Sequence, residues 1–146
     1  MRVLGLDLGR RRIGLALSDP KGVLAFPAGA LERRNLASDL EALRALSVER
    51  GIERIVVGLP IHMSGRVGAE AEAATSFARA LAEATGLPVD TLDERWTTVE
   101  AERALRATGD RSRRRRGVVD SVAAAILLRT YLARLANPAG REGSAG

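Results

Sequence analysis

The order of strand and helix patterns constrains the fold of this chain more than any other feature of its sequence. Strand patterns at residues 2–7, 13–18 and 23–28 come first, and helix patterns then alternate with shorter strand patterns at 55–57 and 88–92. Tight turns between the first three patterns indicate hairpins, and helical connections before the later two indicate parallel crossovers. The sequence therefore predicts an α/β fold with a five-stranded mixed sheet, three antiparallel strands followed by parallel strands, and helices on both faces.

Local signals give the expected ends of the first two helices. Leucines recur at helical spacing behind Asn35, a residue type that caps helices, and Gly51 ends this pattern. A second helix carries Phe77 and Leu81 and is expected to run to Gly86, after a glycine-containing loop. We therefore expect both helices to end at a glycine.

The second half of the chain predicts two more helices. Thr97 and Glu100 form a capping-box pattern, which indicates a helix that ends near Gly109. A run at 111–116, almost all arginine, comes next and is expected to be a basic loop, followed by an apolar helix from about Val118 to Leu135. We expect one domain over residues 1–136 and a disordered tail over 137–146.

Charge and composition narrow the class of protein. The 146 residues contain 23 Lys+Arg and 18 Asp+Glu, which gives a net charge of +5, and nearly all of the positive charge is arginine. Arginine binds phosphate in bidentate fashion, so this balance favours a nucleic-acid partner. The chain has no cysteine, which excludes disulfides, thiolate nucleophiles and cysteine-bound zinc. The sequence shows neither a secretory leader nor a membrane span, so a cytoplasmic location is expected.

Acidic residues stand at three places where strand or helix patterns begin or end. Asp7 breaks the first apolar strand pattern, the pair Asp93 and Glu94 ends the last one, and Asp120 opens the final helix pattern. The carboxyl ends of central strands favour active sites in sheets of this kind. Oxygen ligands from two or three carboxylates suit Mg²⁺ or Mn²⁺, which use substrate phosphate to complete their shell. We therefore expect a divalent-metal site that acts on phosphodiesters.

Asp120 also occupies an unusual place on its helix. Ala124, Leu127 and Tyr131 follow it at the spacing of one helix face, which is the face expected to pack on the sheet. A solvated charge would avoid that stripe, so Asp120 is expected to face the site. For the strand pair the choice stays open, because neighbouring residues of a strand point to opposite faces and either Asp93 or Glu94 could be the ligand.

Several motifs occur in an order that resembles a known family, named YqgF or RuvX. They are Gly5-Leu6-Asp7-Leu8-Gly9, Arg12-Ile13-Gly14, Ser18-Asp19, Gly58-Leu59-Pro60, Met63-Ser64-Gly65, Gly68, Asp93-Glu94-Arg95-Trp96-Thr97-Thr98 and Val119-Asp120-Ser121-Val122-Ala123-Ala124. The resemblance covers about residues 2–135. It implies an RNase H-like fold related to the RuvC resolvases, and a nuclease that matures the 5′ end of the small-subunit ribosomal RNA precursor. Members of the family are also described as Holliday junction resolvases.

The resemblance also implies which acids act. It makes Asp7, Glu94 and Asp120 the catalytic metal ligands, with Asp93 and Arg95 beside them. Our hypothesis is two-metal hydrolysis, in which Asp7 bridges two Mg²⁺ or Mn²⁺ ions and the other two acids complete the ligand shells. His62, the only histidine, stands where the family has a polar residue, and we leave it out of catalysis.

Arginines near the acids are expected to hold backbone phosphates. One group surrounds the first acid and the strand pair, and a second precedes Asp120. They are Arg10, Arg11, Arg12 and Arg95 in the first group and Arg111, Arg113, Arg114, Arg115 and Arg116 in the second. Phosphate contacts of this kind predict binding to RNA precursors, branched DNA or single strands that weakens steeply with salt.

Three other interpretations compete with an RNA nuclease. A Holliday junction resolvase would use the same acids and would need two sites, hence a homodimer, whereas an RNA nuclease could act as a monomer. An actin-like ATPase or sugar kinase begins with a similar Asp7-Leu8-Gly9 hairpin, but such proteins close two lobes around ATP and this chain has residues for barely one. A nucleic-acid-binding scaffold would need the arginines and none of the acids.

Overall fold

The computed structural model describes residues 1–59, 68–93 and 113–137. In these ranges a five-stranded sheet has the strand order β3-β2-β1-β4-β5. Its strands are β1 (Val3–Leu8), β2 (Arg12–Ser18), β3 (Ala25–Glu32), β4 (Arg54–Leu59) and β5 (Val89–Asp93). The first three strands pair antiparallel, and β1, β4 and β5 pair parallel. The predicted mixed sheet is therefore confirmed.

The third strand begins later than its sequence pattern suggested. Residues 23 and 24 were expected to be strand, but the Asp19 carboxylate accepts hydrogen bonds from the backbone N–H groups of Val23 (2.7 Å) and Leu24 (2.8 Å) and holds them in the turn. These bonds, that of Leu24 first, lower the pKa of Asp19. Since the turn uses these two residues, β3 begins at Ala25. Its other end lies at Glu32, beyond the expected end at residue 28.

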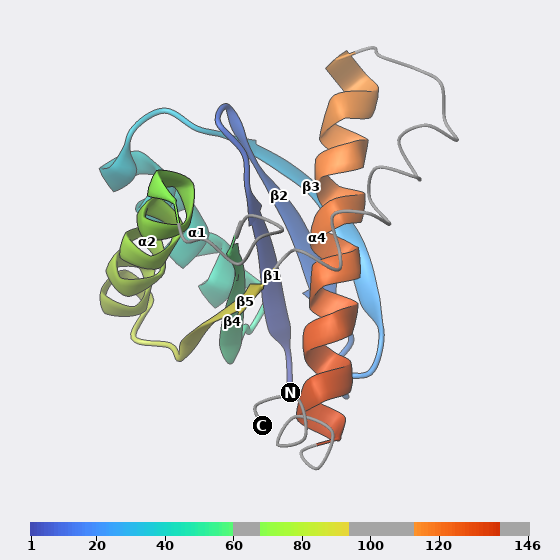
Figure 1. Ribbon diagram of the computed structural model, residues 1–146. Helices are drawn as coiled ribbons and strands as arrows, with labels where there is room; N and C mark the ends of the chain where they lie inside the picture. The colour runs from blue at the N-terminus through green and yellow to red at the C-terminus, as the bar shows by residue number, and fades with distance from the viewer. Residues whose placement is uncertain (60–67, 94–112, 138–146) are drawn as a thin grey trace.

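Helices cover both faces of the sheet (Figure 1). α1 (Leu36–Glu49) and α2 (Ala69–Thr85) lie on one face, and α4 (Arg113–Ala136) crosses the other. Each face has its own apolar core: Leu4, Leu6 and Val57 point toward α1 and α2, whereas Val3 and Val56 point toward α4. This alternation along β1 and β4 follows from the pleat of a strand, and it assigns every strand residue to one face.

The caps expected from the sequence are present. The Asn35 side chain accepts a hydrogen bond from the backbone N–H of Ser38 at 2.8 Å and caps α1. Gly86 ends α2 in the left-handed conformation, with a φ of 71°, which glycine adopts without a steric penalty. The start of α1 and the end of α2 are therefore set by residues next to them in the sequence.

The start of the last helix differs from the expectation. α4 begins at Arg113, so the arginines at 113–116 form its first turns and are not a loop, and Asp120 lies two turns inside the helix instead of in its first turn. Arginine is a good helix former, and a run of like charges weakens a helix without breaking it. The helix expected at 97–109 and the tail expected at 138–146 lie outside the described residues.

The far end of α4 is held to the sheet by polar side chains. Tyr131 donates its hydroxyl to the Asp90 carboxylate on β5, and Arg54 on β4 donates to the same carboxylate at 3.0 Å and to the tyrosine oxygen at 3.3 Å. Tyr131 itself is only 6% exposed. These contacts tie Tyr131, in the C-terminal half of α4, to side chains of β4 and β5. No helix in the described part of the chain is long and apolar enough to span a membrane.

Candidate active site

Asp7 lies near the carboxyl end of β1, on the face that α4 covers. It has the same strand parity as Val3, which belongs to the core under α4, and its side chain is half-buried. In the antiparallel ladder Asp7 pairs with Gly14 of β2. The position beside Asp7 on the neighbouring strand is therefore occupied by a residue without a side chain.

Asp120 reaches the same place from the helix. A Cβ atom added to Gly14 would lie 2.1 Å from the backbone oxygen of Asp120 and 3.2 Å from its Cα. The helix backbone therefore rests directly on β2 beside the strand partner of Asp7, and only glycine allows this approach. The structure thus brings Asp7 and Asp120 to one side of the sheet, at the end where β1 terminates.

The helix face of Asp120 is as predicted. Ala124 and Leu127 are fully buried, with 0% and 1% exposure, and Tyr131 follows at 6%. The Asp120 side chain is 30% exposed, so it sits at the solvent end of this stripe. A carboxylate at such a position is accessible to an ion or a substrate.

Arg12 binds Asp120 directly. Its Nε donates a hydrogen bond to Oδ2 of Asp120 at 2.9 Å, and the Arg12 side chain is 23% exposed. The guanidinium offsets negative charge where Asp7 and Asp120 would otherwise repel one another. The sequence indicated a phosphate ligand at Arg12, whereas the structure shows it as the partner of an acid.

Asp93 is directed to the other face. Its strand neighbour Leu92 belongs to the core under α4, so Asp93 shares the parity of Val89, which packs against the core under α1 and α2. Asp93 therefore ends β5 at the same edge of the sheet as Asp7 but on the opposite side. Glu94 and Arg95 lie outside the described residues.

Asp7 and Asp120 are the described candidates for a metal site. Among residues 1–59, 68–93 and 113–137, no three acidic or histidine side chains gather closely enough to hold an ion. Asp7 and Asp120 offer carboxylate oxygens, the ligands that Mg²⁺ and Mn²⁺ accept. The donor chemistry fits a hard divalent cation and needs further oxygens to complete its shell.

The arginines fall into described and undescribed groups. Arg10 and Arg11 are exposed on the β1–β2 turn, next to the carboxyl end of β1. Arg113, Arg114, Arg115 and Arg116 lie in the first turns of α4, where the structure describes the backbone alone, and Arg111 lies outside the described residues.

Arg33, which follows β3, was not predicted from any sequence pattern. Its Nη1 donates to the carbonyl oxygen of Gly9 at 2.8 Å, and its backbone N–H donates to the carbonyl of Arg11 at 2.8 Å. This brings a third arginine to the β1–β2 turn from 24 positions away. Because only tertiary structure joins these segments, no local pattern could have marked it.

Comparison with known proteins places this arrangement in a family. The sequence profile of the family described as "RuvX: Holliday junction resolvase" matches residues 1–134. A protein of Moorella thermoacetica named "Putative pre-16S rRNA nuclease" is 51% identical over 135 residues, which span 92% of this chain and 96% of the relative. A protein of the same name from Syntrophomonas wolfei is 45% identical over 132 residues, 90% of this chain and 94% of the relative.

Solved structures support the fold independently. The RuvC protein of Thermus thermophilus, in a complex described as containing a Holliday junction substrate, matches with a TM-score of 0.60 at 16% identity, covering 94% of this chain and 97% of RuvC. A second structure of Thermus thermophilus RuvC matches with a TM-score of 0.53. At such low identity the likeness concerns the fold, and it identifies the sheet with its flanking helices as RNase H-like.

Proposed function

This chain belongs to the RuvX family, and from that premise we propose that it is a metal-dependent nuclease that hydrolyses phosphodiester bonds in the 5′ region of the 16S ribosomal RNA precursor. The relatives at 51% and 45% identity bear the corresponding name. The observation that carries the proposal is the approach of Asp120 to Gly14, beside the strand partner of Asp7. Two acids from opposite ends of the chain meet there.

The acids would act as hard oxygen ligands. We assign Asp7 and Asp120 to the metal site and choose Glu94 as the third ligand over Asp93, because Asp93 lies on the face away from Asp7. Two bound Mg²⁺ or Mn²⁺ ions would activate the attacking water and stabilise the leaving oxygen of the phosphodiester. Asp7, near the carboxyl end of a central strand, would be a ligand of both ions.

The arginines would bind and orient the substrate. Arg10 and Arg11 stand on the turn that follows Asp7, and we assign them, with Arg95, Arg111 and Arg113–Arg116, to backbone phosphates on either side of the cut. In the absence of a cation, Arg12 would offset the charge of Asp120 through its 2.9 Å hydrogen bond. Its remaining N–H groups could then donate to a phosphate oxygen of the bound strand.

A Holliday junction resolvase is the second candidate. The family description and the fold shared with RuvC favour it. Symmetric cutting of a junction needs two sites, so this function would also require a homodimer. The proposed place of action is the cytoplasm in either case, because bacteria such as those of the named relatives keep their ribosomal RNA precursors and their DNA there.

Cleavage assays with matched variants test the proposal. End-labelled precursor RNA, single strands and four-way DNA junctions would be incubated with Mn²⁺, Mg²⁺ or EDTA. Loss of an outer-shell partner of a metal ligand costs about 10–100-fold, so Asp7→Asn and Glu94→Gln should each lower the cleavage rate by at least about 100-fold. Asp93→Asn is the control and should cut at nearly the wild-type rate.

The outcomes separate the candidates. Faster cutting of precursor RNA than of junctions supports the ribosomal role, and the reverse order supports the resolvase. Wild-type rates in Asp7→Asn would reject the metal site. Tight binding without any cutting would favour a nucleic-acid-binding scaffold.

A further inference from the structure

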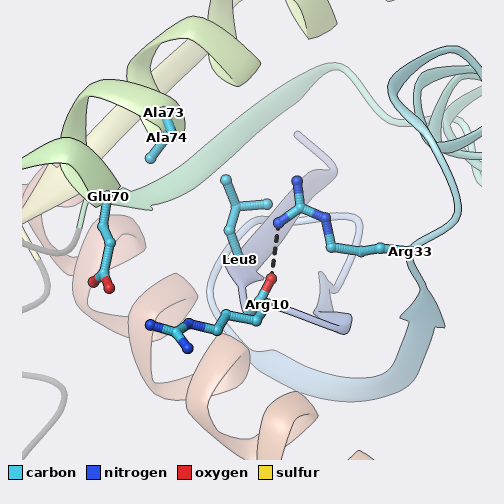
Figure 2. Close-up of a pocket in the computed structure, with 7 residues that line it drawn as sticks. Leu8, Arg10, Arg33, Glu70, Ala73 and Ala74 are labelled. Atoms are coloured by element: carbon cyan, nitrogen blue, oxygen red, sulfur yellow. Dashed lines mark hydrogen bonds between the residues drawn. The ribbon is translucent and has the colours of Figure 1, made fainter.

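A pocket lies on the other side of β1 from Asp7, at the same end of the sheet. Its volume is about 280 Å³, and it opens between the β1–β2 turn, the segment after β3 and the first turns of α2 (Figure 2). Its lining residues are Leu8, Gly9, Arg10, Arg33, Glu70, Ala73 and Ala74. Asp7 and Leu8 are consecutive in β1, so the acid site and this pocket share one strand end.

The size and floor of the pocket fit a single flat group. Leu8 and the alanines at 73 and 74 line it with apolar surface, and Ala74 is 2% exposed. Because alanine side chains are short, the space above α2 stays open. Pockets for small molecules begin at roughly 300 Å³, so this one has room for one sugar or base and for little more.

The two arginines at the rim of the pocket differ in how their side chains are held. Arg33 is held in place by the Gly9 carbonyl at 2.8 Å, and its guanidinium lies 5.7 Å from the centre of the Phe77 ring. The Arg10 side chain has no hydrogen bond or ion pair with any described residue and is exposed. One cation is therefore fixed and the other can turn, an arrangement suited to a phosphate that enters from solvent.

Glu70 adds a carboxylate to this basic rim. It lies in the first turn of α2 and extends toward the β1–β2 turn, where Arg10 lies (Figure 2). Glu70 makes no hydrogen bond or ion pair with a described residue. A carboxylate would repel a phosphate, so it is useful here only to a ligand that also carries a hydrogen-bond donor. The 2′-hydroxyl of ribose is such a donor, and DNA lacks it.

We propose that this pocket binds one ribonucleotide next to the cut bond and gives the protein a preference for RNA over DNA. Arg10 and Arg33 hold its phosphate, the apolar floor receives the sugar or base, and Glu70 accepts a hydrogen bond from the 2′-hydroxyl. The inference rests on the proposed nuclease function, because it needs a strand that passes from the acids over the end of β1 into the pocket. It assigns the choice between RNA and DNA to Glu70.

Binding measured without cleavage tests this. A short single-stranded RNA and the DNA of the same sequence, both fluorescently labelled, would be titrated in EDTA by anisotropy with wild type, Glu70→Ala, Glu70→Gln and Arg10→Ala. Glu72→Ala is the matched control, since Glu72 is exposed in the same helical turn and does not line the pocket. The two substituted positions other than the control, Glu70 and Arg10, line the pocket. Thermal unfolding would verify that each variant folds.

The expected pattern is specific. One lost hydrogen bond is worth roughly 3–10-fold, so Glu70→Ala should lower the ratio of RNA to DNA affinity by that factor, and Glu70→Gln, which keeps an acceptor oxygen, should retain part of it. Arg10→Ala should weaken RNA and DNA alike and reduce the slope of log affinity against log salt by about one.

Two results would overturn the proposal. Glu70→Ala could raise the affinity for RNA and DNA equally or leave both unchanged, which would limit Glu70 to a nonspecific charge effect. Arg10→Ala could bind both strands as tightly as wild type, which would contradict the assignment of a phosphate to this pocket. A wild type that prefers RNA in EDTA through Glu70 but cuts nothing in Mn²⁺ would instead reject the nuclease function and keep the pocket.

Discussion

α4 contacts the sheet near an aspartate–arginine pair at each end, Arg54–Asp90 within the sheet and Arg12–Asp120 between sheet and helix. The two pairs differ in how many hydrogen bonds the acid accepts. At the far end, Asp90 receives hydrogen bonds from both Arg54 and the buried Tyr131. At the near end, Asp120 accepts a hydrogen bond from Arg12 through Oδ2 and lies on the same side of the sheet as the half-buried Asp7. Asp90 therefore has little capacity left for a ligand, whereas Asp120 accepts fewer hydrogen bonds from the described residues.

The difference separates a contact that stabilises the fold from one that is suited to binding a ligand. A carboxylate that two protein donors already bind stabilises the fold and would lose that stabilisation on binding a cation. Two acids on the same side of the sheet, one of them bound by Arg12, favour a cation because it offsets the repulsion between their charges. Similar residues therefore hold the helix at one end and prepare a site at the other.

The strongest way to break this comparison is to separate α4 from β2 at the near end. Gly14→Ala would place a Cβ 2.1 Å from the Asp120 oxygen, so the helix must shift. Overpacking of this kind costs about 1–3 kcal/mol, and we expect the upper end of that range, measured by urea unfolding, together with loss of cleavage.

Gly5→Ala provides a graded control for this substitution. Its Cβ would meet the Leu128 Cβ at 2.9 Å, a less severe conflict farther from the acids. It should cost less stability and leave more cleavage activity than Gly14→Ala. Equal stability of Gly14→Ala and wild type would show that α4 does not rest on Gly14 in solution.

A smaller effect is expected from the far end. Tyr131→Phe removes the hydroxyl that donates to Asp90 but keeps the buried ring and the Arg54–Asp90 pair. The free energy of unfolding should fall by about 1 kcal/mol, and the cleavage rate should not change. A clear loss of activity would contradict the division between the two ends.

The same substitution should alter the alkaline stability. Burial, followed by the hydrogen bond to Asp90, raises the pKa of Tyr131 above its ordinary value of 10.0. The folded protein therefore holds this proton more tightly than the unfolded chain does. The resulting stabilisation is complete below about pH 10 and is lost as the pH rises through the raised pKa. Wild type should lose stability above pH 10 more steeply than Tyr131→Phe in unfolding titrations.

The smallest change in stability should follow removal of Arg12. Partly exposed ion pairs contribute up to about 1 kcal/mol, so Arg12→Ala should unfold almost like wild type. Arg12→Ala should instead strengthen cation binding, because the substitution removes a positive charge that competes with the cation for Asp120. We expect Mn²⁺ to bind roughly 2–5-fold more tightly, as followed by electron paramagnetic resonance. Weaker Mn²⁺ binding would show that Arg12 is needed to position the acid.

Periodicity and local chemistry predicted most of the fold. Asn35 and Gly86 mark helix ends because a cap depends on the few residues around it. The alternation of strand residues places Asp7 with the core under α4, and helical spacing places Asp120 on the packed stripe. The predicted start of α4 was wrong. A run of arginines carries no local signal that distinguishes a loop from a helix that is stabilised by packing farther along the chain.

Contacts between segments that are far apart in the sequence could not be predicted from it. Arg33 and Glu70 line one pocket only because β3 ends and α2 begins beside the same turn. The hydrogen bonds of Tyr131 with Asp90 and Arg54 likewise depend on how α4 crosses the sheet. Asp93 shows a middle case, since alternation offered two choices and only the packing of Leu92 told which face it takes.

The seating of α4 on Gly14 has a consequence for the growing polypeptide. Arg12 and Asp120, the partners nearest that contact, are 108 positions apart in the chain. Contacts so distant in sequence form late in folding, since a long loop must close first. A nascent chain still being translated can pair β1 with β2 and expose Asp7, yet it has no Asp120 to complete the site. The proposed nuclease site would therefore be complete only after the last helix has been synthesised and packed on the sheet.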